Sequence, residues 1–340
     1  EFASEYFVLY NRCRIKDKAD EKLEQALRQW ADKQLLWKYP TRSNLLADHR
    51  KSGVKIFWVD AMGIEWIGLL HHLLTKDGQV DCSVRIARGN LPTTTEANKE
   101  WAEGEDIERG LDDIAHHYAY KHPQSFLKAI EVVQSIAYKA LALLSKHSTV
   151  VITSDHGLSR FVVTSKKRID PPEQAVADSI GRYAVLGQNN VDYAGGNQWI
   201  IDDGNVILMT HSQFKGGVSN PGGEIHGGAT PEEYLVPVIV ARKAISDVKL
   251  QFEVITPTVK VNYKGEGVLN VRSNQKVDEL VLRVGSLVVK GQSDTGLNWS
   301  FNLRNLNTSK YKGKLYSYNR MVGEISFEVI KGIIEEDMGL

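Results

Sequence analysis

The sequence predicts an α/β protein, in which a mostly parallel sheet with helices on both faces is followed by a small all-β, sandwich-like domain. Its 340 residues are enough for about two domains. Up to about residue 245, short apolar runs alternate with longer segments of helical spacing, the order expected of strands joined by crossover helices. After that point, short alternating segments separated by Gly, Asn and Asp favour a β-sandwich.

These changes of pattern divide the chain into three parts. We expect a helical lead-in over residues 1–52, a central α/β domain over 53–245 and a β-sandwich domain over 246–340. Because the sequence begins Glu1-Phe2-Ala3 without a Met, we also expect the lead-in to belong to a longer chain.

Apolar periodicity places the individual elements. Helices are predicted over residues 21–37, 64–74, 106–120 and 125–144. Strands are predicted over 55–59, 82–87, 149–153, 183–186 and 235–241, with a hairpin over 198–209. In the last part, strands are predicted over 250–255, 258–263, 267–272, 279–284, 299–303 and 323–330.

Composition excludes several classes of protein. The 42 basic and 42 acidic residues balance, so a global electrostatic grip on nucleic acid is not indicated. The two cysteines, Cys13 and Cys82, rule out a disulfide scaffold and favour a reducing compartment, so we expect a cytoplasmic protein. No apolar run approaches the roughly 18 residues of a membrane span, and we expect no membrane partner.

Two predicted strands each end in an acidic residue. Asp60 follows the apolar run that ends at Val59, and Asp155-His156-Gly157 follows the strand over 149–153. In open α/β sheets, ligands bind beyond the carboxyl ends of the strands, where an Asp and a His can hold a metal ion. Asp60 could instead be a helix cap, and Asp155 and His156 could belong to an ordinary turn.

A run of hydroxyl side chains, Thr93-Thr94-Thr95, precedes a short helical stretch. A hydroxyl beside a metal ion can act as a nucleophile because the cation lowers its pKa. The alternative is a capping box that only begins the helix.

Three further histidines have the spacing or setting of metal ligands. Asp112 and His116 are four residues apart, as are Asp113 and His117, so each pair shares one helix face and could hold a metal or form a surface ion pair. His226 lies in a glycine-rich loop, where a histidine has no evident role in packing.

Taken in order, these segments resemble the alkaline phosphatase superfamily, and most closely its PglZ domain. The likeness covers roughly residues 54–241 and is strongest at 153–160 and 226–238. It implies an alkaline-phosphatase-like catalytic domain with two metal ions, most often zinc with manganese as an alternative. Such a domain hydrolyses phosphoesters through a covalent phospho-Thr or phospho-Ser.

The resemblance also assigns roles by position. One metal would be held by Asp60, Thr95, Asp155 and His156, and the other by Asp112, His116 and His226. Thr95 is preferred as the nucleophile because related diesterases have Pro-Thr-x-Thr at this place followed by an Asn, here Asn98; Thr93 and Thr94 stay open. Asp112 and His116 are preferred over Asp113 and His117 because relatives have a small residue before the His, here Ala115.

Three polar residues near these segments are candidates for binding the substrate phosphate: Asn98, Lys99 and Arg160. The function that the resemblance implies is a metal-dependent phosphodiesterase or phosphatase of a bacterial BREX-type phage-defence system. Its partners would be other defence proteins, and its substrate a nucleotide or nucleic-acid phosphodiester. The alternatives are a catalytically silent metal-binding scaffold of a defence complex, and a phosphomutase. The mutase is disfavoured because no inserted cap domain is evident between the segments.

Overall fold

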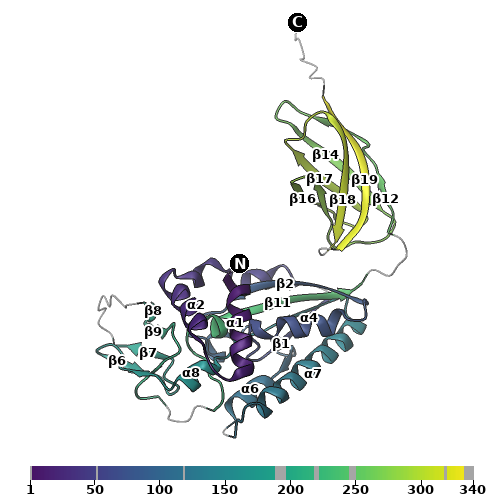
Figure 1. The fold of residues 1–340 in the computed structure, drawn as a ribbon. Coiled ribbons are helices and arrows are strands. Elements are labelled where there is room, and N and C mark those ends of the chain that lie inside the picture. The colour runs from purple at the N-terminus through teal and green to yellow at the C-terminus, as the bar shows by residue number, and fades with distance from the viewer. Residues whose placement is uncertain are drawn as a thin grey trace. The chain divides into compact units, whose positions relative to one another are not determined.

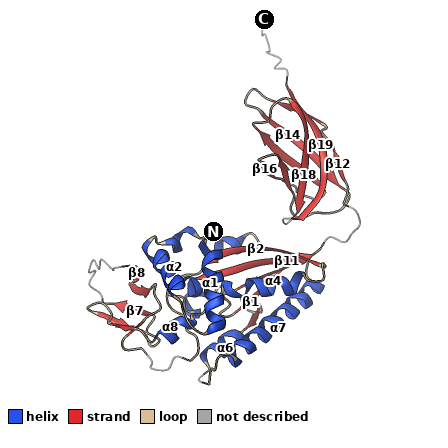
Figure 2. Ribbon diagram, in the orientation of Figure 1, coloured by secondary structure: helices blue, strands red, loops and turns tan. Residues whose placement is uncertain are grey.

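The computed structural model describes residues 2–50, 53–117, 119–187, 197–217, 222–244, 250–317 and 320–332. The chain separates into two compact units, Glu1–Lys243 and Ala244–Leu340 (Figures 1 and 2). Among the described residues, no helix combines the length and the apolar character needed to cross a membrane.

A five-stranded sheet lies at the centre of the first unit, in the order β2–β11–β4–β1–β3. The strands are β1 (Val54–Val59), β2 (Val80–Arg88), β3 (Asp106–Glu108), β4 (Thr149–Thr153) and β11 (Leu235–Lys243). β1 runs parallel to its neighbours β3 and β4, whereas β11 runs antiparallel to both β2 and β4.

The prediction of a mostly parallel α/β fold is wrong. Of the fourteen strand pairings among the described residues, four are parallel and ten are antiparallel. In the central sheet the cause is the start of β11. The two residues before it are held where β4 and β2 end, because Gly157 N–H donates to Glu233 O and Gly89 N–H donates to Tyr234 O. A strand that leaves from that edge must run back between its neighbours in the opposite direction.

Helices cover the faces of this sheet. On one face, α4 (Ile67–Thr75) and α7 (Gln124–Lys146) pack over apolar side chains such as Val59, Ile152 and Ile239. The buried residues of α7 recur at helical spacing, which is why its long apolar stripe was visible in the sequence. On the other face, the short helix α3 (Arg42–Ala47) contributes Leu45 and Leu46 to a second core cluster.

The predicted helix over 106–120 is wrong at its start. Residues Asp106–Glu108 form β3, and the helix α6 begins only at Gly110 and ends at His116. Ile107 has the spacing of the helical stripe, but it belongs to an edge strand that pairs with β1. A three-residue strand is too short to show its own period in the sequence.

Residues 2–50 contribute to the core of the first unit. They form α1 (Phe2–Lys16), α2 (Glu21–Asp32), the 3-10 helix η1 (Leu35–Lys38) and α3. Trp30 Nε1 donates to Ala229 O at 2.8 Å, and Tyr6 OH donates to Glu232 Oε2 at 2.6 Å. The N-terminal helices therefore pack directly against the loop that carries His226.

A small β-rich insertion follows α8 (Arg160–Ser165). Its strands are β5 (Arg168–Ile169), β6 (Ala175–Ala177), β7 (Tyr183–Leu186), β8 (Trp199–Asp202), β9 (Asn205–Leu208) and β10 (Gln213–Phe214). Four of them form the antiparallel sheet β6–β7–β9–β8, and β10 pairs with β5. The predicted hairpin corresponds to β8 and β9, joined by a turn in which Asp203 and Gly204 both have positive φ.

The second unit consists of two sheets around one core. The strands are β12 (Phe252–Val254), β13 (Thr258–Val261), β14 (Glu266–Ser273), β15 (Val281–Val284), β16 (Leu287–Lys290), β17 (Asn298–Arg304), β18 (Ser309–Ser317) and β19 (Arg320–Lys331). One sheet has the order β12–β14–β17 and the other β13–β19–β18–β15–β16. The sequence patterns missed β16 and β18. β18 alternates lysines with Gly, Tyr and Leu, so its apolar face is hard to recognise.

Candidate metal centre

Asp60 and Asp155 lie side by side because β1 and β4 are parallel neighbours. Trp58 is in register with Thr153, so two residues further each strand delivers its carboxylate to the same edge of the sheet. Ala61 adopts a positive φ of 62°, and its N–H donates to Asp155 Oδ1 at 3.2 Å. The chain therefore turns sharply after Asp60 and uses its own backbone to fix the neighbouring carboxylate.

Asp60, Asp155 and His156 form one group, here called the inner group, whose ligand atoms lie within 4.8 Å of one another. His156 Nε2 is 3.4 Å from Asp155 Oδ2 and 3.8 Å from Asp60 Oδ1. All three residues are buried, and the oxygens Asp60 Oδ1 and Asp155 Oδ2 have no hydrogen-bond partner. Burying two neighbouring carboxylates that each keep an oxygen without a donor is costly, and it is typical of a site for a cation.

The carboxylates of the inner group repel one another, and this repulsion affects the pKa of Asp60. Burial, followed by the negative charges of Asp155 and Asp112, raises the pKa of Asp60 to about 8. A divalent cation at this place would remove that repulsion and favour the ionised carboxylate.

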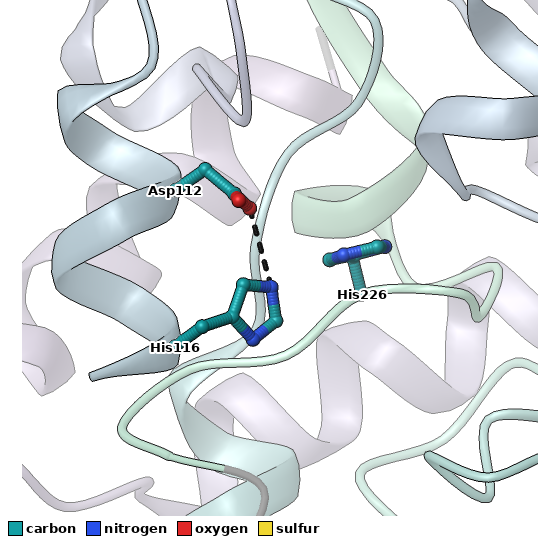
Figure 3. Close-up of side chains that lie close together, drawn as sticks. All are labelled: Asp112, His116 and His226. Atoms are coloured by element: carbon teal, nitrogen blue, oxygen red, sulfur yellow. Dashed lines mark ion pairs between the residues drawn. The ribbon is translucent and has the colours of Figure 1, made fainter. Parts of the chain in front are cut away.

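Asp112, His116 and His226 form a second group, here called the outer group (Figure 3). Asp112 and His116 project from α6 toward His226, and Asp112 Oδ1 is 3.2 Å from His116 Nε2. Burial acts to raise the pKa of Asp112, but the nearby imidazoles, His116 first, outweigh it and hold that pKa below its usual value. The described residues therefore contain two acid/His groups that could each hold a metal ion.

The histidine rings bring the two groups together. The His226 ring stacks on the His156 ring with centroids 4.0 Å apart, and its centroid lies 5.1 Å from that of His116. His226 thus lies between the inner group and the rest of the outer group.

Backbone carbonyls orient two of the rings. His226 Nδ1 is 2.9 Å from Thr93 O, and His156 Nδ1 is 3.2 Å from Gly157 O. A carbonyl only accepts, so each Nδ1 carries the proton and each Nε2 keeps a lone pair that can bind a metal. Burial, followed by the neighbouring imidazoles His156 and His116, lowers the pKa of His226 well below its usual value. A neutral ring is the form that binds a metal ion.

The three threonines have different roles in the structure. Thr93 is fully buried, donates to Gly228 O at 2.6 Å and accepts from Gly227 N, so it joins its loop to the His226 loop. Thr94 caps α5 (Thr95–Asn98) by accepting from the N–H of Ala97. Thr95 Oγ1 lies 3.0 Å from His156 Nε2 and is the hydroxyl that meets the inner group.

The second Asp/His pair faces away from both groups. Asp113 is exposed, and His117 Nδ1 accepts from the N–H of Ala119 at 3.1 Å. The structure therefore brings Asp112 and His116 together with His226 and leaves Asp113 and His117 outside.

Two of the residues expected to bind phosphate are engaged with the protein itself. Asn98 is fully buried, and its amide bonds to backbone groups of Asn90, Pro92 and Thr94, which closes the loop before Thr95. It holds the threonine in position and does not offer its amide to a ligand.

Arg160 likewise binds neighbouring parts of the chain. Its guanidinium donates to both carboxylate oxygens of Asp17 at 2.6 and 2.8 Å and to Gly223 O, and it lies over the Tyr120 ring. The Lys99 ammonium lies 5.9 Å from the centre of the Trp101 ring.

Sequence reasoning missed Arg42, which links three loops around the site. Its guanidinium is buried and donates to the backbone oxygens of Ser154, Asp155 and Asn98 at 2.7–2.9 Å. The guanidinium also donates to Glu100 Oε1 at 2.6 Å. An Arg in the first turn of a short helix gives no signal of this role, because its partners are backbone atoms distant in the sequence.

The glycine of Asp155-His156-Gly157 is required by close packing. A Cβ atom at Gly157 would lie 2.2 Å from Glu232 O and 3.0 Å from Gly63 Cα. Only glycine lets the backbone after His156 approach α9 (Pro231–Tyr234) this closely.

Comparisons with known proteins assign no family to this chain. No family model matches it, and no curated protein matches it. Among solved structures, a polysaccharide lyase is similar over 38% of this chain and 18% of the lyase, with 12% sequence identity and a TM-score of 0.20. The match spans less than a fifth of the lyase, and a likeness of this degree carries no argument about fold or activity.

Proposed function

We propose that this chain is a metal-dependent phosphoester hydrolase, most directly a phosphodiesterase, with Thr95 as its nucleophile. The observation that carries the proposal is the contact of 3.0 Å between Thr95 Oγ1 and His156 Nε2, inside a buried group in which Asp60 Oδ1 and Asp155 Oδ2 lack hydrogen-bond donors. The adjoining outer group supplies the ligands for a second ion. The resemblance to PglZ domains agrees with this proposal and suggests a cytoplasmic phage-defence setting with other defence proteins as partners.

The donor set fits divalent zinc, with manganese as the alternative. Both groups consist of imidazole nitrogens and carboxylate oxygens without a thiolate, and Cys13 and Cys82 belong to neither. When bound, two such ions would stabilise the charge on the attacking and leaving oxygens of an in-line displacement.

The chain's own residues position the nucleophile. Asn98 closes the loop, Thr94 caps α5, and Thr95 is thereby presented toward His156. In the first step, Thr95 Oγ forms a bond to phosphorus while the bond to the leaving alcohol breaks, and the hydroxyl proton passes to that alcohol through solvent. In the second step, water attacks the phosphothreonine and releases phosphate or its monoester, which restores the Thr95 hydroxyl.

The test is cleavage of bis-p-nitrophenyl phosphate with added zinc or manganese. We expect Thr95→Ala to lower kcat by about 10³-fold or more with nearly unchanged metal content, and Thr95→Ser to retain part of the activity. Unchanged turnover in Thr95→Ala would move the nucleophile elsewhere. Metal binding without cleavage of any phosphoester by the unaltered chain would favour a silent metal-binding scaffold.

A further inference from the structure

Arg109 lies at the same sheet edge as the inner group. β3 ends at Glu108, which is in register with Val59 of β1, and the Asp60 N–H donates to Glu108 O at 2.8 Å. One residue further along each strand, Arg109 therefore lies beside Asp60. Asp155 follows β4 on the other side of Asp60, so the three strand ends place Arg109, Asp60 and Asp155 in a row.

The alternation of side chains puts Arg109 and Asp60 on the same face. The Glu108 carboxylate binds the Gly110 N–H and Lys139 of α7, so it points to the face that α7 covers. Val59 packs into the core on that face as well. Successive residues of a strand point to opposite faces of the sheet. Asp60 follows Val59 and Arg109 follows Glu108, so both side chains point to the face opposite α7.

Electrostatics and helix spacing agree with this placement. Arg109 is near enough to Asp60 to act on its carboxylate as a favourable positive charge. Arg109 also comes three residues before Asp112, at the start of α6, and so lies close to a member of the outer group.

The Arg109 side chain is exposed, and within the described ranges its guanidinium makes no hydrogen bond and no ion pair. Arg42 and Arg160, by contrast, are engaged with backbone oxygens and carboxylates. Arg109 thus carries unpaired N–H donors at a position that adjoins one member of each acid/His group, Asp60 and Asp112. A guanidinium binds phosphate oxygens through paired, charge-assisted hydrogen bonds.

We propose that Arg109 is a substrate-binding residue that holds a non-bridging phosphate oxygen and selects anionic phosphoesters over neutral esters. The inference rests on the proposed function and extends it. The metal ligands account for the attacking and leaving oxygens, and Arg109 supplies a partner for a remaining charged oxygen. Because it binds the anion before and during the reaction, its loss should raise KM more than it lowers kcat.

The experiment measures binding of inorganic phosphate to the metal-loaded full chain by titration calorimetry, independently of turnover. We expect Arg109→Ala to weaken phosphate binding about 10- to 100-fold with unchanged metal content. The phosphate affinity of Arg109→Lys should lie between those of the unaltered chain and Arg109→Ala, because an ammonium keeps the charge but lacks the paired donors. The matched control is Arg85→Ala, an exposed Arg within the edge strand β2, which should bind phosphate as the unaltered chain does.

Each other outcome overturns the proposal in a distinguishable way. Phosphate binding by Arg109→Ala equal to that of the unaltered chain, with phosphoester cleavage still present, would reject Arg109 and leave the hydrolase standing. Loss of metal from Arg109→Ala would show that the residue supports the ligands instead of the anion. An unaltered chain that is loaded with metal but neither binds phosphate nor cleaves phosphoesters would reject both proposals.

Discussion

Replacing Arg182 by Met tests how the β-rich insertion holds the His226 loop in place. Arg182 is fully buried, and its guanidinium donates to both carboxylate oxygens of Glu233, at 2.8 and 2.6 Å. The same carboxylate accepts hydrogen bonds from Gly228 and Thr230, two and four residues after His226. Arg182 therefore neutralises the charge that organises this turn.

The expected cost follows from leaving Glu233 buried without its partner. Removing one member of a buried ion pair costs about 3–5 kcal/mol in the free energy of unfolding. Arg182 also donates to the carbonyl oxygens of Leu208, Thr210 and Ser212, which would lose a donor as well. We expect Arg182→Met to lie at the upper end of this range and to weaken metal binding at the outer group.

The assay is urea unfolding, read on the transition of the first unit. The matched control is Lys215→Met, which breaks the 2.8 Å ion pair with Asp170 in the same insertion, where the two side chains are 58% and 75% exposed. This change should cost about 0–1 kcal/mol. The double variant Arg182→Met/Glu233→Gln should cost less than the sum of its single changes, because no unpaired charge remains. A cost for Arg182→Met within 1 kcal/mol of the Lys215→Met control would refute the reasoning.

Three further predictions concern the surroundings of the site. Burial acts to lower the pKa of His211, but carboxylates, Glu232 first, outweigh it and raise that pKa to about 9. The protonated His211 therefore stabilises the folded chain by on the order of 3 kcal/mol, an amount that is complete below about pH 6.5 and lost as the pH rises through 9, so Tm should fall over this range. His211→Gln should be less stable than the unaltered chain at pH 6, and its Tm should depend less on pH. Equal slopes of Tm against pH for the two proteins would contradict this prediction. Gly157→Ala should cost about 2 kcal/mol or more and lower activity, because the new Cβ would overlap Glu232 O at 2.2 Å; a fully stable, active variant would show that the loop relaxes freely. Asp113→Asn/His117→Gln should keep its metal content and activity, and an inactive variant would mean that this pair, not its neighbour, belongs to the site.

Sequence patterns located the candidate ligands where a strand end is visible. Asp60 and Asp155-His156 directly follow apolar runs of strand length, and the parallel pairing of β1 with β4 brings them together. The spacing of four residues placed Asp112 and His116 on one helix face, but Asp113 and His117 have the same spacing and were equally good candidates for metal ligands. Only the fold decides between the pairs, because it determines which face of α6 meets His226.

The direction of β11 and the extent of β3 could not be predicted from the sequence. An apolar run looks the same whether the strand is parallel or antiparallel, so the sequence does not show that β11 runs antiparallel to β2 and β4. Ile107 fits the helical stripe of α6 by spacing, and this concealed the strand end that places Arg109 beside Asp60. Polar residues that bind backbone atoms, such as Arg42, have no periodicity by which to find them.

Metal content tests the central claim most directly. Elemental analysis of chelator-free protein supplied with zinc or manganese should find about two ions per chain. Asp155→Asn and His226→Ala should each lose about one equivalent, because they remove ligands of different groups. No bound metal in the unaltered chain, or unchanged content in both variants, would contradict the account of two metal-binding groups.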